Sequence, residues 1–453
     1  MKNDKYLREF KVNLTSLSAA DKKLMVKLVE VVRLVAPLYA QQVNSKYPGA
    51  NFYPHDASRE EIEKAAHNNP DILSPYTVVE RQNGQLVAIP YHVKYQKALL
   101  PISRALHEAA ALSDGQMSRY LKATAEALLA GDYDEIDKYW LSLKNYNIDI
   151  LIGPFERYVD KLFFIKRAYQ GYLGLVNRQL TKLAQDIRDV LYNTIENNPD
   201  IKHRIIPLER TQVSAIDNIA FSGFLAESLF SQEHFPCNEA NMEKYGARII
   251  IYASSLKYKF DNLLYPIFQS VFEKRFQSGY SRELLEKANS LYVLVRGIAQ
   301  QMHRYQGARE RLKELFPIID EANSPVSGIQ HCKHLIMKGV ISQKELEAII
   351  ITHICWMFSE WVLIKKTQTR SDYLHGDALV LGFYLTEGAL RLQDGISWPN
   401  FSKIFFEIER LSLIFVRLIT IGDYQEAKDF FGKYLKLSVF DQLAVRLTKI
   451  KPI

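Results

Sequence analysis

A chain of 453 residues is long for one compact core, so two domains or lobes are the default expectation. Apolar residues make up 47% and charged residues 24% of the sequence, which is ordinary for a soluble globular protein. The net charge of +7 is spread along the chain without a basic block or arginine-rich arm, so we expect no nucleic-acid partner.

The N-terminal segment contains no apolar stretch of the signal-peptide kind, and no uninterrupted apolar run approaches the roughly 20 residues of a membrane-spanning helix. Three cysteines, Cys237, Cys332 and Cys355, cannot build a disulfide framework and indicate a reducing compartment. We therefore expect a cytoplasmic protein without a membrane span. Export by a route that needs no N-terminal signal stays open.

The first part of the chain predicts helices and one clear hairpin. Apolar spacing predicts a helix at 18–44, and Ser58 with Glu61 three residues later is typical of a helix N-terminus. Two runs rich in β-forming residues flank an Asn-Gly pair, so 76–89 is the strongest hairpin signal in the sequence. Further helices are expected at 93–129 and 134–143.

The middle of the chain begins with a short apolar run that meets Gly153 and Pro154. We expect a chain break at this dipeptide and a helix rich in aromatic residues after it, within 149–177. From Leu256 to the end the pattern is almost wholly helical, with breaks at glycine and proline. A helix is also expected at 178–197, and short strands at 213–221 and 247–253.

One pair of predicted helices carries residues with metal-ligand chemistry. Apolar spacings of three and four place His303 on an amphipathic helix at 293–305, and a second helix follows with Glu321 near its end. A zinc helix usually carries His-Glu-x-x-His, in which the two histidines share a face and the glutamate is the general base. Here Ala299 and Gln300 occupy the positions of the first ligand and the base. The sequence thus contains part of a zinc site.

A second group of potential ligands comprises His331, Cys332 and His334, with Cys355 further along the chain. Their spacing fits no usual zinc pattern, and Lys333 among them would repel a cation. We interpret these side chains as ordinary residues on helix faces.

Several stretches, taken in chain order, are similar to one known family. They are the hairpin at 76–89 with the Pro-Tyr that follows, the acidic and aromatic segment 125–140, the Gly-Pro-Phe-Glu-Arg-Tyr-Val-Asp block at 153–160, His234-Phe-Pro-Cys237-Asn, Glu387-Gly-Ala, and 422–427. This collinear set resembles the dipeptidyl peptidase III family of zinc exopeptidases, and its shorter bacterial members in particular. The zinc motif of this chain would then be degenerate.

The resemblance implies a mainly α fold with a small β component, arranged as two lobes around a cleft. Residues 1–176 would form a mixed α/β lobe, and 177–212 would be a helical segment that crosses to the second lobe. Residues 213–260 would return to the mixed lobe, and 261–453 would form a helical lobe with the remnant zinc site.

The family binds zinc through two histidines of one helix and a glutamate of the next. The resemblance places the second histidine at His303 and the glutamate at Glu321, while the first histidine falls on Ala299, or on Ile298 under a longer spacing. The base position falls on Gln300, or on Ala299, and neither side chain accepts a proton at neutral pH. His375 corresponds either to a histidine of the family's catalytic region or to an ordinary helix-surface residue.

The family's peptide-binding residues are better preserved. Glu156 corresponds to the residue that binds the substrate amino terminus, and Tyr158 to the tyrosine that stabilises the transition state. Glu156 is also explained as a carboxylate at a helix N-terminus, stabilised by the helix dipole, and both explanations can hold. The family's paired asparagines, which hold the peptide backbone, fall on His234 and Cys237.

We expect a catalytically inactive relative of this family, a pseudo-metallopeptidase that binds a peptide or protein in the cleft and needs no cofactor. One alternative is an active zinc-dependent dipeptidyl peptidase whose missing ligand lies elsewhere in the sequence. Another is a helical interaction scaffold without relation to peptidases. The sequence leaves open whether the protein is a monomer or a dimer.

Overall fold

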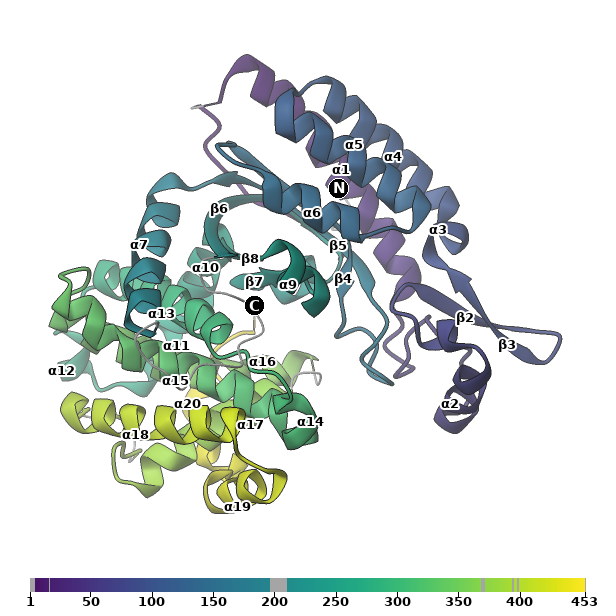
Figure 1. Ribbon diagram of the computed structural model, residues 1–453. Helices are drawn as coiled ribbons and strands as arrows, with labels where there is room; N and C mark the ends of the chain where they lie inside the picture. The colour runs from purple at the N-terminus through teal and green to yellow at the C-terminus, as the bar shows by residue number, and fades with distance from the viewer. Residues whose placement is uncertain are drawn as a thin grey trace. The chain divides into compact units, whose positions relative to one another are not determined.

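The computed structural model describes residues 5–15, 17–195, 210–367, 371–392, 395–396 and 399–452. These residues are mainly helical and include a six-stranded sheet and a separate two-stranded sheet, which confirms the predicted fold class (Figure 1). The chain divides into two compact units, and the division falls within strands of the larger sheet. The first unit is Met1–Asn177, Ile216–Phe230 and His234–Arg248, and the second is Arg178–Ala215, Ser231–Glu233 and Ile249–Ile453.

In the first unit the long helices α1, α4 and α5 lie side by side (Figure 1). The hydroxyl of Ser18 accepts a hydrogen bond from the backbone N–H of Asp21 and caps α1, and Ser58 caps α2 in the same way through Glu61, as predicted. The elements are β1 (Leu7–Glu9), α1 (Ala19–Gln42), α2 (Arg59–Asn68), η1 (Pro70–Leu73), β2 (Thr77–Gln82), β3 (Gln85–Pro90), α3 (Tyr91–Lys94), α4 (Gln96–Ala111), α5 (Gly115–Ala130), α6 (Asp134–Ser142), β4 (Ile148–Glu156), β5 (Ala168–Val176), α8 (Phe224–Ser228) and α9 (Glu239–Tyr245).

The predicted hairpin is confirmed as β2 and β3, whose register pairs Thr77 with Pro90. Asn83 and Gly84 form the two-residue turn with φ values of 49° and 82°, a conformation that Asn-Gly adopts readily. The ammonium group of Lys166 donates to the carbonyls of Ile72 and Ser74 and to the hydroxyl of Thr77, so it fixes the base of the hairpin.

The predicted break and helix within 149–177 are wrong, because this segment forms the antiparallel strands β4 and β5. Pro154 lies inside β4, which is tolerated because β4 is an edge strand and has a register shift just after the proline. Between the strands, the carboxylate of Asp160 accepts hydrogen bonds from four backbone N–H groups, those of Leu162, Phe163, Ile165 and Lys166. This loop therefore has no need of a helix to satisfy its backbone donors.

The two short strands predicted after the first unit's main segment are confirmed as β6 (Thr211–Ser222) and β8 (Ala247–Tyr252), and β7 (Gln232–Phe235) lies between them in sequence. The larger sheet has the order β4-β5-β6-β8-β7, and β1 pairs with β6. Its strands β4 and β5 are buried almost throughout, so they show no alternation of buried and exposed residues.

The second unit is a helical assembly in which α13 packs on α15, and α15 packs on α17 and α18. The predicted helix at 178–197 corresponds to α7 in this unit. The elements are α7 (Arg178–Ile195), α10 (Ala253–Lys259), η3 (Phe260–Leu264), α11 (Tyr265–Val271), α12 (Lys274–Gln277), α13 (Arg282–Met302), α14 (Ala308–Leu312), η4 (Lys313–Leu315), α15 (Phe316–Met337), α16 (Gln343–Thr367), α17 (Ser371–Thr386), α18 (Phe401–Thr420), α19 (Tyr424–Tyr434), η5 (Leu437–Leu443) and α20 (Ala444–Leu447).

Helix α16 contains a stretch, Gln343–Leu363, that is long and apolar enough to cross a membrane by length and composition, which the sequence reasoning missed. Of this stretch, 89% is buried inside the protein. An apolar helix in the core of a globular unit has the same composition, and the burial of α16 accounts for its apolar residues.

Two helix boundaries near the predicted metal residues differ from expectation. Helix α13 ends at Met302, so His303 is its C-cap residue rather than a residue within the helix. The following chain turns at Gly307 and Lys313, which have positive φ values of 71° and 53°. Helix α15 begins only at Phe316, so Glu321 lies near the start of its helix and not near the end.

Candidate functional site

Glu321 lies beside a cation supplied by the chain itself. The Arg296 guanidinium, on α13, donates to the Glu321 carboxylate on α15 at 2.8 Å, and the two side chains are 18% and 14% exposed. A charge-assisted hydrogen bond of this length is strong, and partial burial shields it from water and salt. The carboxylate that the resemblance assigns to zinc is therefore engaged by a guanidinium.

The positions that the resemblance assigns to the first zinc ligand and the general base carry Ala299 and Gln300, and both side chains have structural contacts. Ala299 is fully buried and presents only a methyl group. The side-chain amide of Gln300 lies 3.4 Å from the carboxylate of Asp320, so it forms a second, weaker polar link between α13 and α15. An amide cannot take up a proton from water at neutral pH.

His303 is directed to a different part of α15. Its ring stacks on that of His331 with the ring centres 6.0 Å apart, and its Nδ1 lies 3.5 Å from the Tyr305 hydroxyl. His331 lies ten residues after Glu321 on the same helix, and ten helical residues rise about 15 Å. Glu321 and His331, the residue that His303 contacts, therefore lie on different turns of α15.

These residues do not fit a catalytic zinc ion. Such an ion usually has three protein ligands within about 2.0–2.3 Å. Within the described part of the chain, no three or more His, Cys, Asp or Glu side chains gather as metal ligands. Of the second potential group, Cys332 and Cys355 are buried helix-face residues, and burial raises the pKa of both thiols. Lys333 forms an ion pair with Glu409 at 2.6 Å.

His375 lies on α17 and is partly buried. Its neighbour Gly376 packs against the backbone of α15, because a Cβ there would lie 3.3 Å from the Ile318 carbonyl. His375 therefore belongs to a helix that contacts the Glu321 helix, and both interpretations of this histidine stay open.

In the first unit, Glu156 is the last residue of β4, so its explanation as a helix N-terminal carboxylate is wrong. It is 3% exposed and accepts a hydrogen bond from the backbone N–H of Tyr158. Nearby, the Tyr39 hydroxyl donates to Glu227 at 3.0 Å. Burial raises the pKa of Tyr39 far above its usual value, and the charges of Glu227 and Glu156 add to this shift. Glu156 and Glu227 thus both act on the Tyr39 hydroxyl. Each also has a cation close by, because Arg157 interacts electrostatically with Glu156 and Lys5 forms an ion pair with Glu227 at 3.1 Å.

Tyr158 lies two residues after Glu156, with Arg157 between them, and belongs to an aromatic cluster. Its ring stacks on Phe224 with centres 6.0 Å apart and meets Phe230 edge-on at 6.2 Å. All three rings are partly exposed, and Phe224 and Phe230 contact each other at 5.6 Å. The cluster forms a partly exposed apolar surface that includes Tyr158, two residues after Glu156.

The other two predicted peptide-binding residues flank a proline. His234 lies near the end of β7, and Cys237, which is not part of a disulfide, follows the cis bond between Phe235 and Pro236. The next helix, α9, is joined to α6 by the Asn241 amide, which donates to Asp134 at 2.8 Å and to Asp137 at 2.9 Å.

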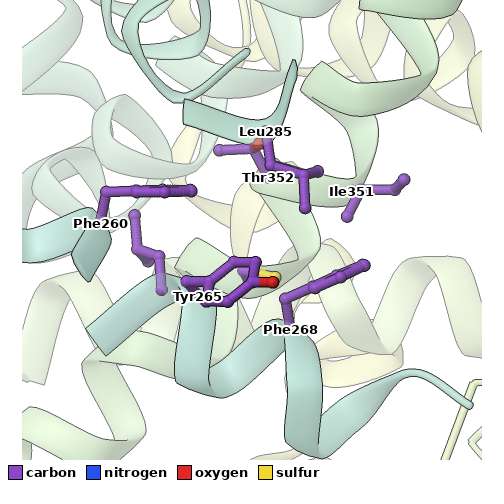
Figure 2. Close-up of a pocket in the computed structure, with 8 residues that line it drawn as sticks. Phe260, Tyr265, Phe268, Leu285, Ile351 and Thr352 are labelled. Atoms are coloured by element: carbon purple, nitrogen blue, oxygen red, sulfur yellow. The ribbon is translucent and has the colours of Figure 1, made fainter. Parts of the chain in front are cut away.

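A small cavity lies in the second unit among η3, α11, α13 and α16 (Figure 2). Its volume of about 10 Å³ is no larger than one water molecule requires. The Thr352 hydroxyl at its wall already donates to the Ala348 carbonyl at 2.9 Å. The lining residues are Phe260, Leu264, Tyr265, Phe268, Leu285, Ile351, Thr352 and Cys355, and their apolar character fits a packing defect rather than a ligand site.

Arg296 is the functional residue that sequence reasoning missed. It interrupts a run of buried residues on α13, from Leu291 to Val295 and from Gly297 to Ala299. A cation in such a run requires a carboxylate partner, and that requirement was a usable signal.

No protein-family model matches the chain. The chain is 23% identical over 428 residues to Nudix hydrolase 3 of Arabidopsis thaliana, an alignment that covers 87% of this chain and 55% of that protein. The chain thus spans about half the length of this curated relative.

Two solved structures share the fold. One is dipeptidyl peptidase III from Caldithrix abyssi, with a TM-score of 0.85 and 24% identity over 98% of this chain and 97% of that one. The other is dipeptidyl peptidase III from Corallococcus sp. strain EGB, with a TM-score of 0.80 and 21% identity over 98% and 94%. The predicted dipeptidyl peptidase III-like fold is confirmed.

Proposed function

We propose that this protein is a catalytically inactive dipeptidyl peptidase III-like protein that binds peptides through their amino termini without cleaving them. The two structural neighbours carry the name of a peptidase, and the fold that they share with this chain supports a peptide as ligand. The observation that favours inactivity most strongly is the pairing of Glu321 with Arg296.

Zinc-dependent hydrolysis needs an ion that lowers the pKa of its bound water, and a base that accepts the proton. Glu321 is bound to a guanidinium, and the Gln300 amide replaces the base. His303 contacts the far part of α15. Each of these three features opposes assembly of a hydrolytic centre.

Peptide binding rests on two carboxylates of the first unit. A peptide ammonium group is attracted to the buried carboxylate of Glu156, and the partly exposed Glu227 acts with it on Tyr39. The adjacent ring cluster of Tyr158, Phe224 and Phe230 offers apolar contacts to a peptide side chain. We therefore assign the amino-terminal ammonium to Glu156.

Calorimetry with a free and an N-acetylated form of one peptide tests the binding function. Acetylation removes the charge, and loss of a charged hydrogen bond of about 1.5–3 kcal/mol predicts a preference of roughly tenfold or more for the free peptide. Glu156→Gln should abolish the preference, whereas Glu135→Gln, which changes an exposed carboxylate on α6, should retain it. Equal affinities for both peptides in the unchanged protein would remove this role from Glu156.

A cleavage assay with a dipeptidyl-naphthylamide and added zinc tests inactivity. We expect no release of naphthylamine above that of a zinc-only control. Release that a chelator suppresses would establish the alternative, an active zinc-dependent dipeptidyl peptidase with a divergent site.

A further inference from the structure

We propose that the Arg296 guanidinium acts as the cation of the second unit's helix core, in the place of a metal ion, and holds α13, α15 and α17 together. The inference rests on the proposed function, because it explains how the helices near Glu321 are joined when no zinc binds there. The Glu321 carboxylate would then bind a cation of the chain itself, the Arg296 guanidinium.

The helix backbones approach each other closely at Arg296. A Cβ on Gly328 of α15 would lie 2.7 Å from the Val295 carbonyl and 2.9 Å from the Arg296 backbone nitrogen. Only glycine permits such an approach of two helices. Glu321 also lies on α15. The ion pair and the glycine contact therefore both fix α13 against α15 at or beside Arg296.

Helix α17 packs against α15 next to Glu321. A Cβ on Gly376 of α17 would lie 3.4 Å from the Ala322 backbone nitrogen, next to Glu321. Asp377 and Tyr373, both on α17, act electrostatically on Arg296 together with Glu321 and Tyr292. Acidic groups of α15 and α17 thus both act on this guanidinium.

The balance of charge at this site favours a permanent cation. Burial alone would lower the pKa of Arg296, but Glu321, Tyr292, Tyr373 and Asp377 more than offset this and raise it above its usual value. Arginine remains charged under all physiological conditions, so the link does not vary with pH. A metal held by histidine would instead be lost on acidification.

The neighbouring imidazole stays neutral. Burial, together with a smaller contribution from the charge of Arg296, lowers the pKa of His353 to about 3. His353 lies 3.4 Å from the Tyr292 hydroxyl and 3.3 Å from the Tyr384 hydroxyl, which hold it as an uncharged group. A second cation at this site would meet repulsion from Arg296, and this opposes entry of zinc beside Glu321.

Chemical rescue of Arg296→Ala tests the proposal. The variant should lower the unfolding midpoint by roughly 5–15 °C, because it leaves Glu321 with an uncompensated charge. Ethylguanidinium at non-denaturing concentration should restore part of that loss, whereas ammonium at the same ionic strength and zinc chloride should not. Arg309→Ala, which changes an exposed arginine on α14, is the matched control and should show neither loss nor rescue.

A second variant keeps the test valid if Arg296→Ala fails to fold. Replacing both partners, in Arg296→Met with Glu321→Leu, should fold and should be more stable than Arg296→Met alone. An unchanged midpoint for Arg296→Ala, or a double variant no more stable than the single one, would overturn the proposal. Stoichiometric zinc in the unchanged protein would instead overturn the proposed function, whatever the outcome for the Arg296 variants.

Discussion

The two carboxylates that the resemblance assigns to substrate and metal differ in their electrostatic surroundings. Glu156, at the end of β4 in the first unit, shares its region with Glu227, and together the two charges act on Tyr39. Glu321, on α15 in the second unit, pairs with Arg296 at 2.8 Å. A carboxylate close to a second carboxylate attracts a cationic ligand, whereas an ion pair within the chain stabilises the fold.

The difference shows why a preserved residue type does not imply a preserved function. Both positions carry the glutamate that the resemblance requires, and only the surrounding charges distinguish them.

The largest expected effect is the loss of stability on removing each carboxylate. Glu321→Ala should destabilise the second unit by about 3–5 kcal/mol, because it leaves the Arg296 cation buried without its partner. Glu156→Ala removes one of two neighbouring negative charges and should cost about 1.5 kcal/mol or less. Urea unfolding of both variants measures the difference, and equal losses would contradict the comparison.

The next effect concerns Asp137 in the first unit, which should make the free energy of unfolding depend on pH. Burial raises its pKa from 3.8 to about 7, with a further contribution from Asp134, although the hydrogen bond from Asn241 opposes the shift. Because the folded state retains a proton that the unfolded state releases, stability falls as the pH rises from about 4 to about 7. Asp137→Asn removes this penalty and should stabilise the protein above pH 7 by up to about 4 kcal/mol.

The measurement is the free energy of unfolding of Asp137→Asn and the unchanged protein across pH 4 to 8. The gap between them should open between the two pKa values and then stay constant. A gap that does not vary with pH would show that Asp137 is ionised in the folded protein.

In the second unit, His353 should make the protein less stable as the pH falls. Its folded pKa of about 3 lies below the ordinary value of 6.5, so the unfolded state gains a proton first as the pH falls. The unchanged protein should therefore lose about 2 kcal/mol more than His353→Gln between pH 7 and pH 5. Thermal unfolding at both pH values tests this, and parallel losses would place a proton on the native imidazole.

The smallest expected effect concerns the second carboxylate of the first unit. Glu227 is partly exposed and forms an ion pair with Lys5 at 3.1 Å, so solvent screens its charge. Glu227→Gln should weaken binding of a free peptide by about 1 kcal/mol or less, roughly fivefold at most. A loss as large as that of Glu156→Gln would mean that Glu227 contacts the ammonium directly.

Much of the fold could be predicted because local signals agreed with the final structure. The Asn83-Gly84 turn and the two runs beside it specified the β2–β3 hairpin, and Ser18 and Ser58 marked helix starts. The strands β4 and β5 were missed because both faces are buried, which removes the alternation that identifies a strand. Pro154 then gave a misleading break signal, since an edge strand tolerates proline.

The candidate site was less predictable because its chemistry depends on pairs distant in sequence. A motif alignment identified Glu321 and His303, but it carried no information about Arg296, which lies 25 positions before Glu321. Likewise, the stacking of His303 on His331 depends on how α13 and α15 pack. The resemblance named the positions, and tertiary packing decided which partners they have.

Metal analysis of the purified, unchanged protein tests the central claim most directly. After dialysis against buffer containing zinc and then against metal-free buffer, mass spectrometry should find far less than one zinc ion per chain. His303→Ala should leave this value unchanged, because His303 contacts His331 and Tyr305 rather than Glu321's ion pair. One zinc per chain that a chelator removes, and that is lost in His303→Ala or Glu321→Ala, would contradict the account.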